Sequence, residues 1–271
     1  MLMETIQLNN GVTMPLVGLG TWALRGEECT RVVKEALAMG YRLVDTAQMY
    51  DNEQAVGEGL RQSGVAREKI FLTTKIHRPS NSYAKARTAI DASLRNLGVD
   101  YVDLLLLHEP YTQGPEMYRA LEEALAAGKA RSIGISNYNP RWYANFLHQC
   151  EIVPMVNQLE CHVFFQKWQF QQDMQQHDTV LQAWAPLASG EGGIPKQPVL
   201  AEIGACYGKT PAQIALRFLV QRGISVIPKT SHLSRLEENL AIFDFTLTDD
   251  DMATIRALDR GATFFPWTEA F

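Results

Sequence analysis

The chain has 271 residues with a formal net charge of −5, and 46% of the residues are apolar. This length fits one hydrophobic core, and the composition is that of a globular protein rather than a disordered or fibrous one. The acidic balance gives no attraction for nucleic acid or an anionic membrane, and the longest apolar runs, such as 101–107, cannot cross a bilayer, so we expect neither partner.

A β-hairpin is predicted at the start of the chain. The short runs 5–8 and 12–14 flank Asn9-Asn10-Gly11, and Asn-Gly readily takes the positive φ angles of a tight hairpin turn. From residue 16 onward, short β-rich runs alternate with longer helical patterns. This alternation is typical of repeated βαβ units and a parallel sheet.

Eight strands are expected in this region, and eight is the number that closes a (β/α)8 TIM barrel. They lie at 16–20, 42–45, 70–75, 102–108, 132–135, 155–158, 180–183 and 225–227. The helices between and after them are expected at 27–39, 53–62, 83–97, 116–127, 141–148, 166–176, 211–221 and 234–241. An extra C-terminal helix is predicted over 248–258, and with no linker in the sequence we expect a single domain, 1–271.

Nearly every predicted strand is an apolar run that ends in a residue able to bind or react. These residues are Asp45, Lys75, His108, Asn137, Gln158, Trp184 and Lys229. In a barrel the carboxyl ends of all strands face one mouth, where such folds place their active sites. A single polar strand end is as often an ordinary solvated loop residue. Seven successive ones predict a site at this mouth.

Long stretches of the sequence resemble the aldo-keto reductase family. The segment GYRLVDTAQMYDNEQAVG at 40–57 is similar to the family signature, and TTK at 73–75, HEP at 108–110, GISN at 134–137, NQLE at 157–160 and IPKT at 227–230 follow the same pattern. Within the family, the chain resembles short-loop, prokaryotic-type aldehyde and ketone reductases of the 2,5-diketogluconate reductase kind. The resemblance implies a catalytic tetrad of Asp45, Tyr50, Lys75 and His108.

The chemistry of carbonyl reduction explains these residue types. A hydride must reach the carbon while a proton reaches the oxygen, and a free tyrosine, with a pKa of about 10, is a poor acid at neutral pH. At about 4 Å and an effective dielectric of about 20, the Lys75 ammonium favours a phenolate by roughly 4 kcal/mol before desolvation is subtracted. We therefore expect Lys75 to lower the pKa of Tyr50, Asp45 to keep Lys75 charged, and His108 to direct the substrate oxygen. Without the other three residues, we would interpret Tyr50 as an aromatic side chain that packs over a loop.

NADPH is the cofactor that the resemblance implies. The segment GLGTW at 18–22 lacks the third glycine and the immediate helix of a dinucleotide-binding fingerprint. We therefore do not interpret it as such a motif. Ser136, Asn137 and Gln158 are expected to hold the nicotinamide amide, and Trp184 to stack on its ring, although it could also be a core tryptophan. The full set of expected cofactor residues is Gly20, Thr21, Trp22, Asp45, Ser136, Asn137, Gln158, Trp184, Ala185, Pro186, Leu187, Ser189, Ile227, Lys229, Thr230, Ser231, Arg235, Glu238 and Asn239.

Lys229 and Arg235, with Thr230 and Ser231 between them, form a short cationic, hydroxyl-rich loop before a helix. Two cations and helix N-terminal amides suit a phosphate monoester, which favours NADPH over NADH. The alternative is an ordinary solvated helix start. The resemblance implies that Glu238 and Asn239 contact the adenine and that Leu187 and Ser189 belong to the pyrophosphate loop.

The expected substrate-binding residues are Trp22, Tyr50, His77, His108, Glu109 and Trp267. His77 and Glu109 stand where tryptophans are frequent in the family, so the pocket should favour small or polar carbonyl compounds. Glu109 either raises the pKa of the His108 imidazole or points to solvent. In the tail FFPWTEAF, Trp267 and Phe271 either fold over the opening or pack on the barrel exterior.

The cysteines and histidines indicate neither a disulfide framework nor a metal site. Cys29, Cys150, Cys161 and Cys206 form no C-x-x-C pair, and the six histidines show no H-x-H or H-E-x-x-H spacing. We expect a cytoplasmic monomer that acts on a small-molecule carbonyl. Two rival hypotheses are a non-catalytic barrel that binds NADPH as a regulatory subunit and a metal-dependent hydrolase on the same fold.

Overall fold

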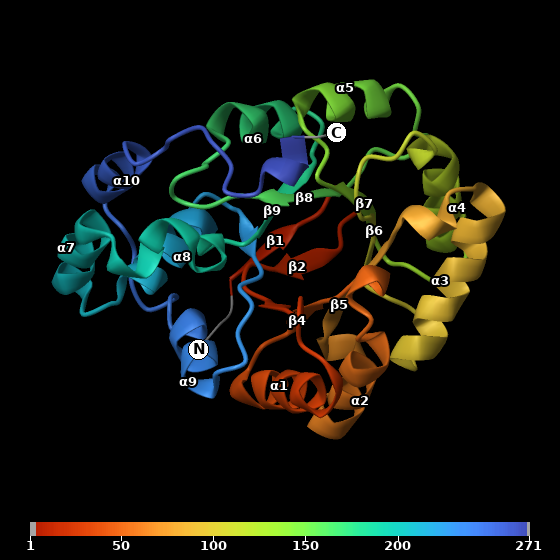
Figure 1. Cartoon of the computed structure of the whole chain (residues 1–271), viewed down its shortest axis with the longest axis horizontal. Helices are drawn as coiled ribbons and strands as arrows, with labels where there is room; N and C mark the ends of the chain where they lie inside the picture. Colours follow the sequence, from red (N-terminus) through yellow and green to blue (C-terminus); the bar gives the residue numbers. More distant parts are fainter. Residues whose placement is uncertain (1–3, 270–271) are drawn as a thin grey trace.

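A hairpin opens the computed structural model, which describes residues 4–269 (Figure 1). Strand β1 (Thr5–Gln7) pairs antiparallel with β2 (Thr13–Pro15). Gly11 takes a φ of 84°, and the amide of Leu8 donates to the carbonyl of Val12 at 2.8 Å, which closes the turn. The predicted hairpin is therefore present.

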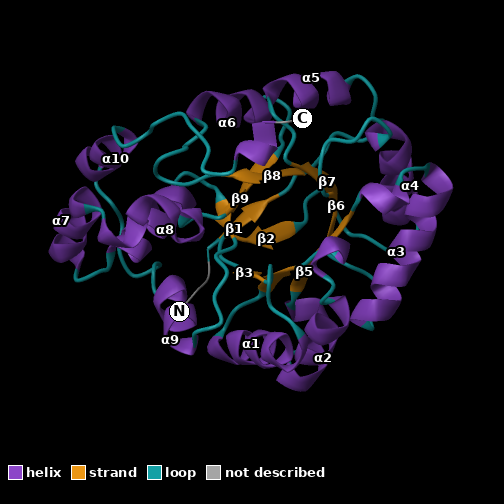
Figure 2. Ribbon diagram, in the orientation of Figure 1, coloured by secondary structure: helices purple, strands orange, loops and turns teal. Residues whose placement is uncertain are grey.

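Eight parallel strands form one sheet in the order β10-β9-β8-β7-β6-β5-β4-β3. Their bounds are β3 Leu19–Gly20, β4 Leu43–Asp45, β5 Phe71–Ile76, β6 Leu104–Leu107, β7 Ile133–Ser136, β8 Val156–Glu160, β9 Val180–Trp184 and β10 Ser225–Val226. The two edge strands meet, because the Gly18 amide donates to the Val226 carbonyl at 2.9 Å and the Val226 amide donates to Leu16 at 2.8 Å. The sheet thus closes into the predicted barrel, and Figure 2 shows its ring of strands.

Close packing around β3, against β10 on one side and β4 on the other, requires glycine at two positions. A Cβ at Gly20 would lie 2.6 Å from the Ile227 carbonyl oxygen, and one at Gly18 would lie 2.1 Å from a methyl group of Leu43. Only a residue without a side chain lets the two strands and the neighbouring core approach this closely. The strands β3 and β10 have only two residues each, so they are shorter than the sequence predicts.

Helices follow the strands and cover the outside of the barrel (Figure 1). They are α1 Gly26–Met39, α2 Glu53–Ser63, α3 Tyr83–Leu97, α4 Gly114–Ala126, α5 Pro140–Leu147, α6 Trp168–Gln175, α8 Pro211–Gln221 and α9 Leu233–Leu240. The helix α8 begins with a capping box, in which Thr210 and Gln213 satisfy each other's backbone amides. All eight lie where the alternating pattern predicts helices.

Two further helices lie outside the repeat. The predicted C-terminal helix is α10 (Asp249–Arg256), and Thr248 caps it. The second, α7 (Pro198–Tyr207), is absent from our prediction. It has a proline at the first turn and a left-handed Gly208 at the end, which are ordinary start and stop signals. None of the helices within the described residues is both long and apolar enough to span a membrane.

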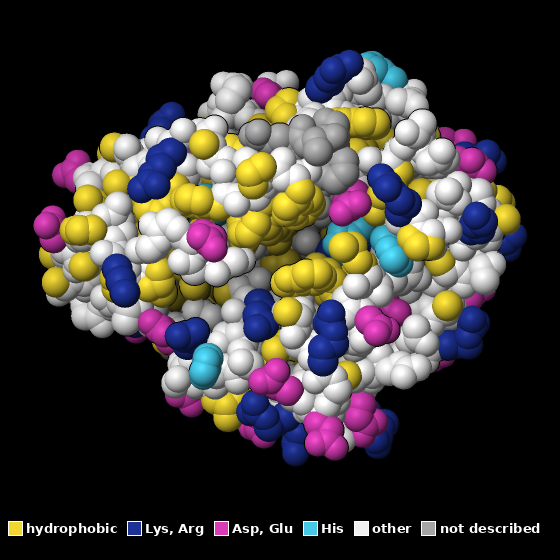
Figure 3. Space-filling view, in the orientation of Figure 1, with side chains coloured by type: hydrophobic (Ala, Val, Ile, Leu, Met, Phe, Trp, Pro, Cys, Tyr) yellow, Lys and Arg dark blue, Asp and Glu magenta, His cyan; other side chains and the backbone are white. Residues whose placement is uncertain are grey.

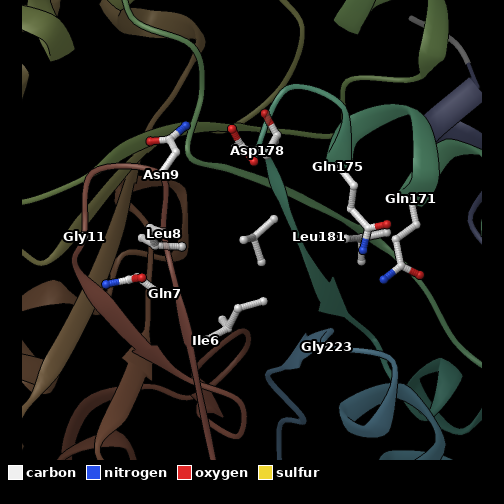
Figure 4. A pocket seen from close by; sticks show the side chains of 12 residues that line it. Ile6, Gln7, Leu8, Asn9, Gly11, Gln171, Gln175, Asp178, Leu181 and Gly223 are labelled. Atoms are coloured by element: carbon white, nitrogen blue, oxygen red, sulfur yellow. The ribbon is translucent and has the colours of Figure 1, made fainter.

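The hairpin closes the amino-terminal end of the barrel. Met14 is fully buried there, its sulfur accepts a hydrogen bond from Gln182 at 3.6 Å, and the Ser225 hydroxyl donates to the Pro15 carbonyl. Beside the hairpin lies a cavity of about 660 Å³ (Figure 4), which is lined by Ile6, Gln7, Leu8, Asn9, Gly11, Gln171, Gln175, Asp178, Thr179, Val180, Leu181 and Gly223. With this end closed by the hairpin, the predicted reactive residues gather at the opposite mouth.

Candidate active site

The Lys75 ammonium is the centre of a buried polar cluster at the carboxyl ends of β4 and β5. Its Nζ lies 2.5 Å from Asp45 Oδ1, 3.0 Å from the Thr46 carbonyl oxygen and 3.2 Å from the Tyr50 hydroxyl. Lys75 and Asp45 are both essentially inaccessible to solvent. An ammonium has three donors and no acceptor, so all three are used, and the Tyr50 oxygen accepts. The phenol proton is therefore free to point away from Lys75.

Tyr50 is placed by the short 3-10 helix η1 (Gln48–Tyr50), which ends at Asp51 in the left-handed conformation. Its ring makes edge contacts with the Trp22 ring at 5.0 Å and with the His108 imidazole at 5.5 Å. Asn52 fixes the loops on both sides: its amide donates to the Thr21 and Leu24 carbonyls, and its oxygen accepts from Thr46. This role of Asn52 was not predicted from the sequence.

Burial and charge act against each other on the tetrad. Burial lowers the pKa of Lys75, but the Asp45 carboxylate and the Tyr50 oxygen raise it more, so Lys75 stays an ammonium. Burial raises the pKa of Asp45, and Lys75 and Gln158 oppose this. Burial also raises the pKa of Tyr50 above its ordinary value, and Lys75 only partly offsets the effect. The expected net lowering of the pKa of Tyr50 is therefore wrong for this state, because desolvation outweighs the ammonium.

His108 is buried beside this cluster as a neutral imidazole. Burial, with smaller contributions from Lys75 and His77, holds the pKa of His108 well below its ordinary value. Its Nδ1 atom is buried and has no hydrogen-bond partner among the described residues. A neutral imidazole can donate a hydrogen bond to a substrate oxygen from one ring nitrogen without carrying charge into the pocket.

The four residues predicted to hold the nicotinamide form one hydrogen-bonded group. The Ser136 hydroxyl donates to the Gln158 carbonyl at 3.0 Å, and the Trp184 indole N–H donates to Asn137 Oδ1 at 2.9 Å. Asn137 takes a φ of 63°, and its amide donates to the His108 carbonyl at 3.1 Å. The group therefore connects the strands β7, β8 and β9 to His108.

Gln158 connects this group to the tetrad. Its Nε2 donates to Asp45 Oδ2 and to Gln182 Oε1, each at 2.7 Å. Both amide hydrogens are thus committed inside the protein, and Oε1 remains as the acceptor. An acceptor beside Ser136 and Asn137 suits a primary carboxamide, which needs both a donor and an acceptor.

The loop after β9 is rich in left-handed backbone. Ala185, Ala188 and Ser189 have φ of 46°, 53° and 51°, and Gly190 and Gly192 have 91° and 64°. Successive turns of this kind direct amides into concave anion-binding surfaces. The predicted Pro186 and Leu187 lie in the same loop.

The predicted phosphate loop follows β10. Lys229 and Arg235 are exposed, and neither has an ion-pair partner among the described residues. Thr230 is buried with its hydroxyl accepting from the His232 amide, and Ser231 is half-buried before α9. Unpaired cations beside a helix N-terminus are chemically suited to a phosphate.

The remaining predicted cofactor residues lie on both sides of the barrel seam. The Thr21 hydroxyl donates to the Asp45 carbonyl at 2.9 Å, and Gly20 bridges to Lys229. Ile227 contacts Gly20 across the same seam. On α9, Asn239 is buried, and a Glu238 oxygen accepts from Thr210 at 2.5 Å. These positions extend from the tetrad to α9 along one rim of the mouth.

Contacts and charge link the predicted substrate residues in small groups: the Tyr50 ring touches Trp22 and His108, and the charge of Glu109 acts on His77. Figure 3 shows a hollow on one face of the molecule, with hydrophobic side chains inside it and His, Lys and Arg side chains around it. Glu109 is half-buried, and its charge acts on His77 and Tyr111. It does not raise the pKa of His108, which is lowered, so that alternative is wrong. Burial lowers the pKa of His77 despite the opposing carboxylate.

The tail lies at the mouth rather than on the barrel exterior. Trp267 stacks on Trp184 with ring centroids 5.6 Å apart and an angle of 14°, and Phe265 makes an edge contact with the same indole. Trp267 is still 47% exposed. Phe271 lies outside the described residues.

The sequence profile of the Aldo/keto reductase family matches residues 16–260 of this chain. This range includes the whole predicted tetrad and the predicted phosphate loop. The chain belongs to the aldo/keto reductase family. It is therefore an oxidoreductase that acts on carbonyl compounds, and the predicted family, fold and enzyme class are confirmed.

Individual aldo/keto reductases agree with this assignment. The 9,11-endoperoxide prostaglandin H2 reductase of Trypanosoma cruzi (strain CL Brener) is 41% identical over 94% of this chain and 91% of that protein. The glyoxal reductase of Bacillus subtilis (strain 168) is 40% identical over 96% and 94%. A crystal structure of a Gox0644 mutant in complex with NADPH superposes with a TM-score of 0.90, at 36% identity over 96% of this chain and 95% of that one. NADPH is the cofactor that the sequence predicts.

Proposed function

We propose that this protein reduces an aldehyde or ketone with NADPH and that Tyr50 is the proton donor. The observation that carries the proposal is the Lys75 ammonium, which lies within hydrogen-bond distance of both Asp45 and the Tyr50 hydroxyl. The rival hypothesis of a non-catalytic NADPH-binding subunit has no use for this buried ion pair. Turnover of a simple aldehyde with NADPH, compared with Tyr50→Phe, tests the proposal.

Each residue has one task in this mechanism. Bound NADPH supplies the hydride. Ser136, Asn137 and Gln158 hold the nicotinamide amide, and Trp184 offers a flat surface for ring stacking. His108 and Tyr50 hold the carbonyl oxygen between an imidazole and a phenol.

Proton transfer follows from the charge distribution around Tyr50. Because burial keeps the pKa of Tyr50 high, the phenol holds its proton until substrate arrives. As hydride adds to the carbon, negative charge develops on the oxygen and passes to the phenol when its proton leaves. Lys75 stabilises the phenolate that forms, and Asp45 keeps the ammonium in place.

Lys229 and Arg235 are expected to select NADPH over NADH. Removal of one charge-assisted contact to the 2′-phosphate costs about 1.5–3 kcal/mol, so Arg235→Ala should lower the NADPH/NADH ratio of kcat/KM by about 10- to 100-fold. Initial-rate kinetics with both cofactors measure this ratio. Arg31→Ala on the exposed surface of α1 is the matched control. An unchanged ratio in Arg235→Ala would show that the phosphate loop does not discriminate.

Small or polar carbonyl compounds are the proposed substrates, because His77 and Glu109 put an imidazole and a carboxylate near the opening. That the related Bacillus subtilis protein is a glyoxal reductase supports this class. Glu109→Trp should raise kcat/KM for a large aromatic aldehyde relative to glyoxal by about tenfold, since an added indole gives stacking of about 0.5–1.5 kcal/mol and removes a repelling charge.

Glu109→Gln separates the two effects, because it keeps the size of the side chain and removes the charge. A wild-type preference for large aromatic aldehydes, or a selectivity that Glu109→Trp leaves unchanged, would contradict the proposed substrate class. A single domain over 1–271, a monomeric state and a cytoplasmic location stay predictions.

A further inference from the structure

Glu160 is a buried carboxylate outside the tetrad. It is the last residue of β8 and is 2% exposed. Its oxygens accept hydrogen bonds from the Thr263 hydroxyl, from the Phe264 amide at 3.0 Å and from His162 Nε2 at 3.0 Å. Within residues 4–269 it has no lysine or arginine partner, so these three donors satisfy it. Two of the three come from the C-terminal tail.

The fully buried His162 presents a fixed donor to this carboxylate. Its Nδ1 accepts from the Phe164 amide at 3.3 Å, so the ring proton is on Nε2, the atom that faces Glu160. A buried carboxylate is costly unless its acceptor sites are filled. Thr263 and Phe264 fill the sites that His162 leaves, which ties the tail to β8.

The anchored tail contacts two elements expected to bind NADPH: the predicted pyrophosphate loop, which includes Ser189, and Trp184. A Cβ at Gly192 would lie 2.5 Å from Phe264 Cζ, so the phenyl ring lies directly against the backbone of the loop 188–193. The same ring packs on His162 and Phe164. In the same segment, Phe265 and Trp267 both contact the Trp184 ring. Figure 1 shows the last described segment of the chain, in dark blue, beside β8.

We propose that Glu160 is a positioning residue that fixes the segment 263–267 across the mouth and thereby holds the loop 188–193 and Trp184 in place for NADPH. Trp267 supports one face of the Trp184 indole, and the other face serves the nicotinamide. The inference rests on the proposed function for its cofactor part. The contact between Glu160 and the tail stands independently of it.

The first test uses the protein without cofactor. Glu160→Leu keeps much of the side-chain volume but has no oxygen to accept the hydrogen bonds of Thr263 and Phe264, so the tail should detach. Stacked indoles give a circular-dichroism exciton signal, and Trp267→Phe defines its absence. We expect Glu160→Leu to lose most of this signal, and Phe245→Ala, which removes a half-buried phenyl from another part of the surface, to keep it. An intact signal in folded Glu160→Leu would overturn the anchoring role.

The second test is the release of NADPH, followed by stopped-flow fluorescence. Glu160→Leu and Phe264→Ala should each raise the dissociation rate constant by about tenfold, the effect of losing about one hydrogen bond or packing contact, while Phe245→Ala should not. Phe264→Ala keeps the test valid if Glu160→Leu does not fold. Release that is unchanged or slower in both variants would overturn the proposal. If the wild-type protein bound no NADPH, the proposed function would fail, and the first test could still be read.

Discussion

Tyr50→Phe is expected to lower kcat for aldehyde reduction by about a thousandfold, which is within the range that a positioned general acid contributes. The variant removes the phenol proton that is transferred in the proposed mechanism, while Lys75, Asp45 and His108 stay in place. Phenylalanine lacks only the hydroxyl that contacts Lys75 and keeps the ring. The aromatic packing against Trp22 and His108 should therefore persist. Steady-state kinetics and a fluorescence titration with NADPH measure the loss of rate and the retained binding.

Tyr207→Phe is the matched control, since it removes a phenol that bonds to Asp251 on the outside of the barrel. Its kcat should equal that of the wild-type protein. If Tyr50→Phe kept more than about a tenth of the wild-type kcat, another group would have to supply the proton, and the assignment of Tyr50 would be wrong.

Lys75→Met is expected to destabilise the protein by about 3–5 kcal/mol and to abolish measurable turnover, because it leaves the Asp45 carboxylate buried without its cation. The methionine fills a similar volume, so lost packing contributes little. The three groups that Lys75 satisfies, on Asp45, Thr46 and Tyr50, all lose a donor at once. Urea denaturation followed by circular dichroism gives the free energy of unfolding.

The double variant Asp45→Asn/Lys75→Met separates stability from catalysis. Without the unpaired charge it should recover at least about half of the lost free energy of unfolding, since replacing both partners of a buried pair costs less than removing one. It should remain inactive. A single Lys75→Met variant as stable as the wild-type protein would show that Asp45 is protonated or hydrated, in conflict with the proposed ion pair.

The barrel could be predicted because its signals are local. Each strand is a short apolar run, each helix has its own period, and the polar residue at each strand end marks the same mouth. The helix α7 was missed because its sequence, PVLAEIGACY, is apolar on most sides and follows a glycine-rich loop, which hides the helical period. Its proline start and glycine end were the available signal.

The sequence predicted residues that the fold brings together at one mouth, but it could not predict their energetics. The pKa of Tyr50 depends on how much water its surroundings exclude, and that is a property of the folded mouth rather than of the spacing from Tyr50 to Lys75. Glu160 belongs to the NQLE segment that supports the family resemblance, yet its partners Thr263 and Phe264 lie at the far end of the chain. Contacts of such long sequence separation leave no periodic pattern.

The seam between β3 and β10 has a consequence for biosynthesis. Gly20 and Thr21 come from the first βα unit, whereas Lys229 and Arg235 come from the last, and closure of the barrel brings them together. A nascent chain still attached to the ribosome can form its early strands and helices, but the proposed cofactor site is incomplete until residue 239 has left the exit tunnel. Capture of the dinucleotide therefore belongs to the end of synthesis, and prematurely terminated chains are denied the stabilisation that a bound ligand gives.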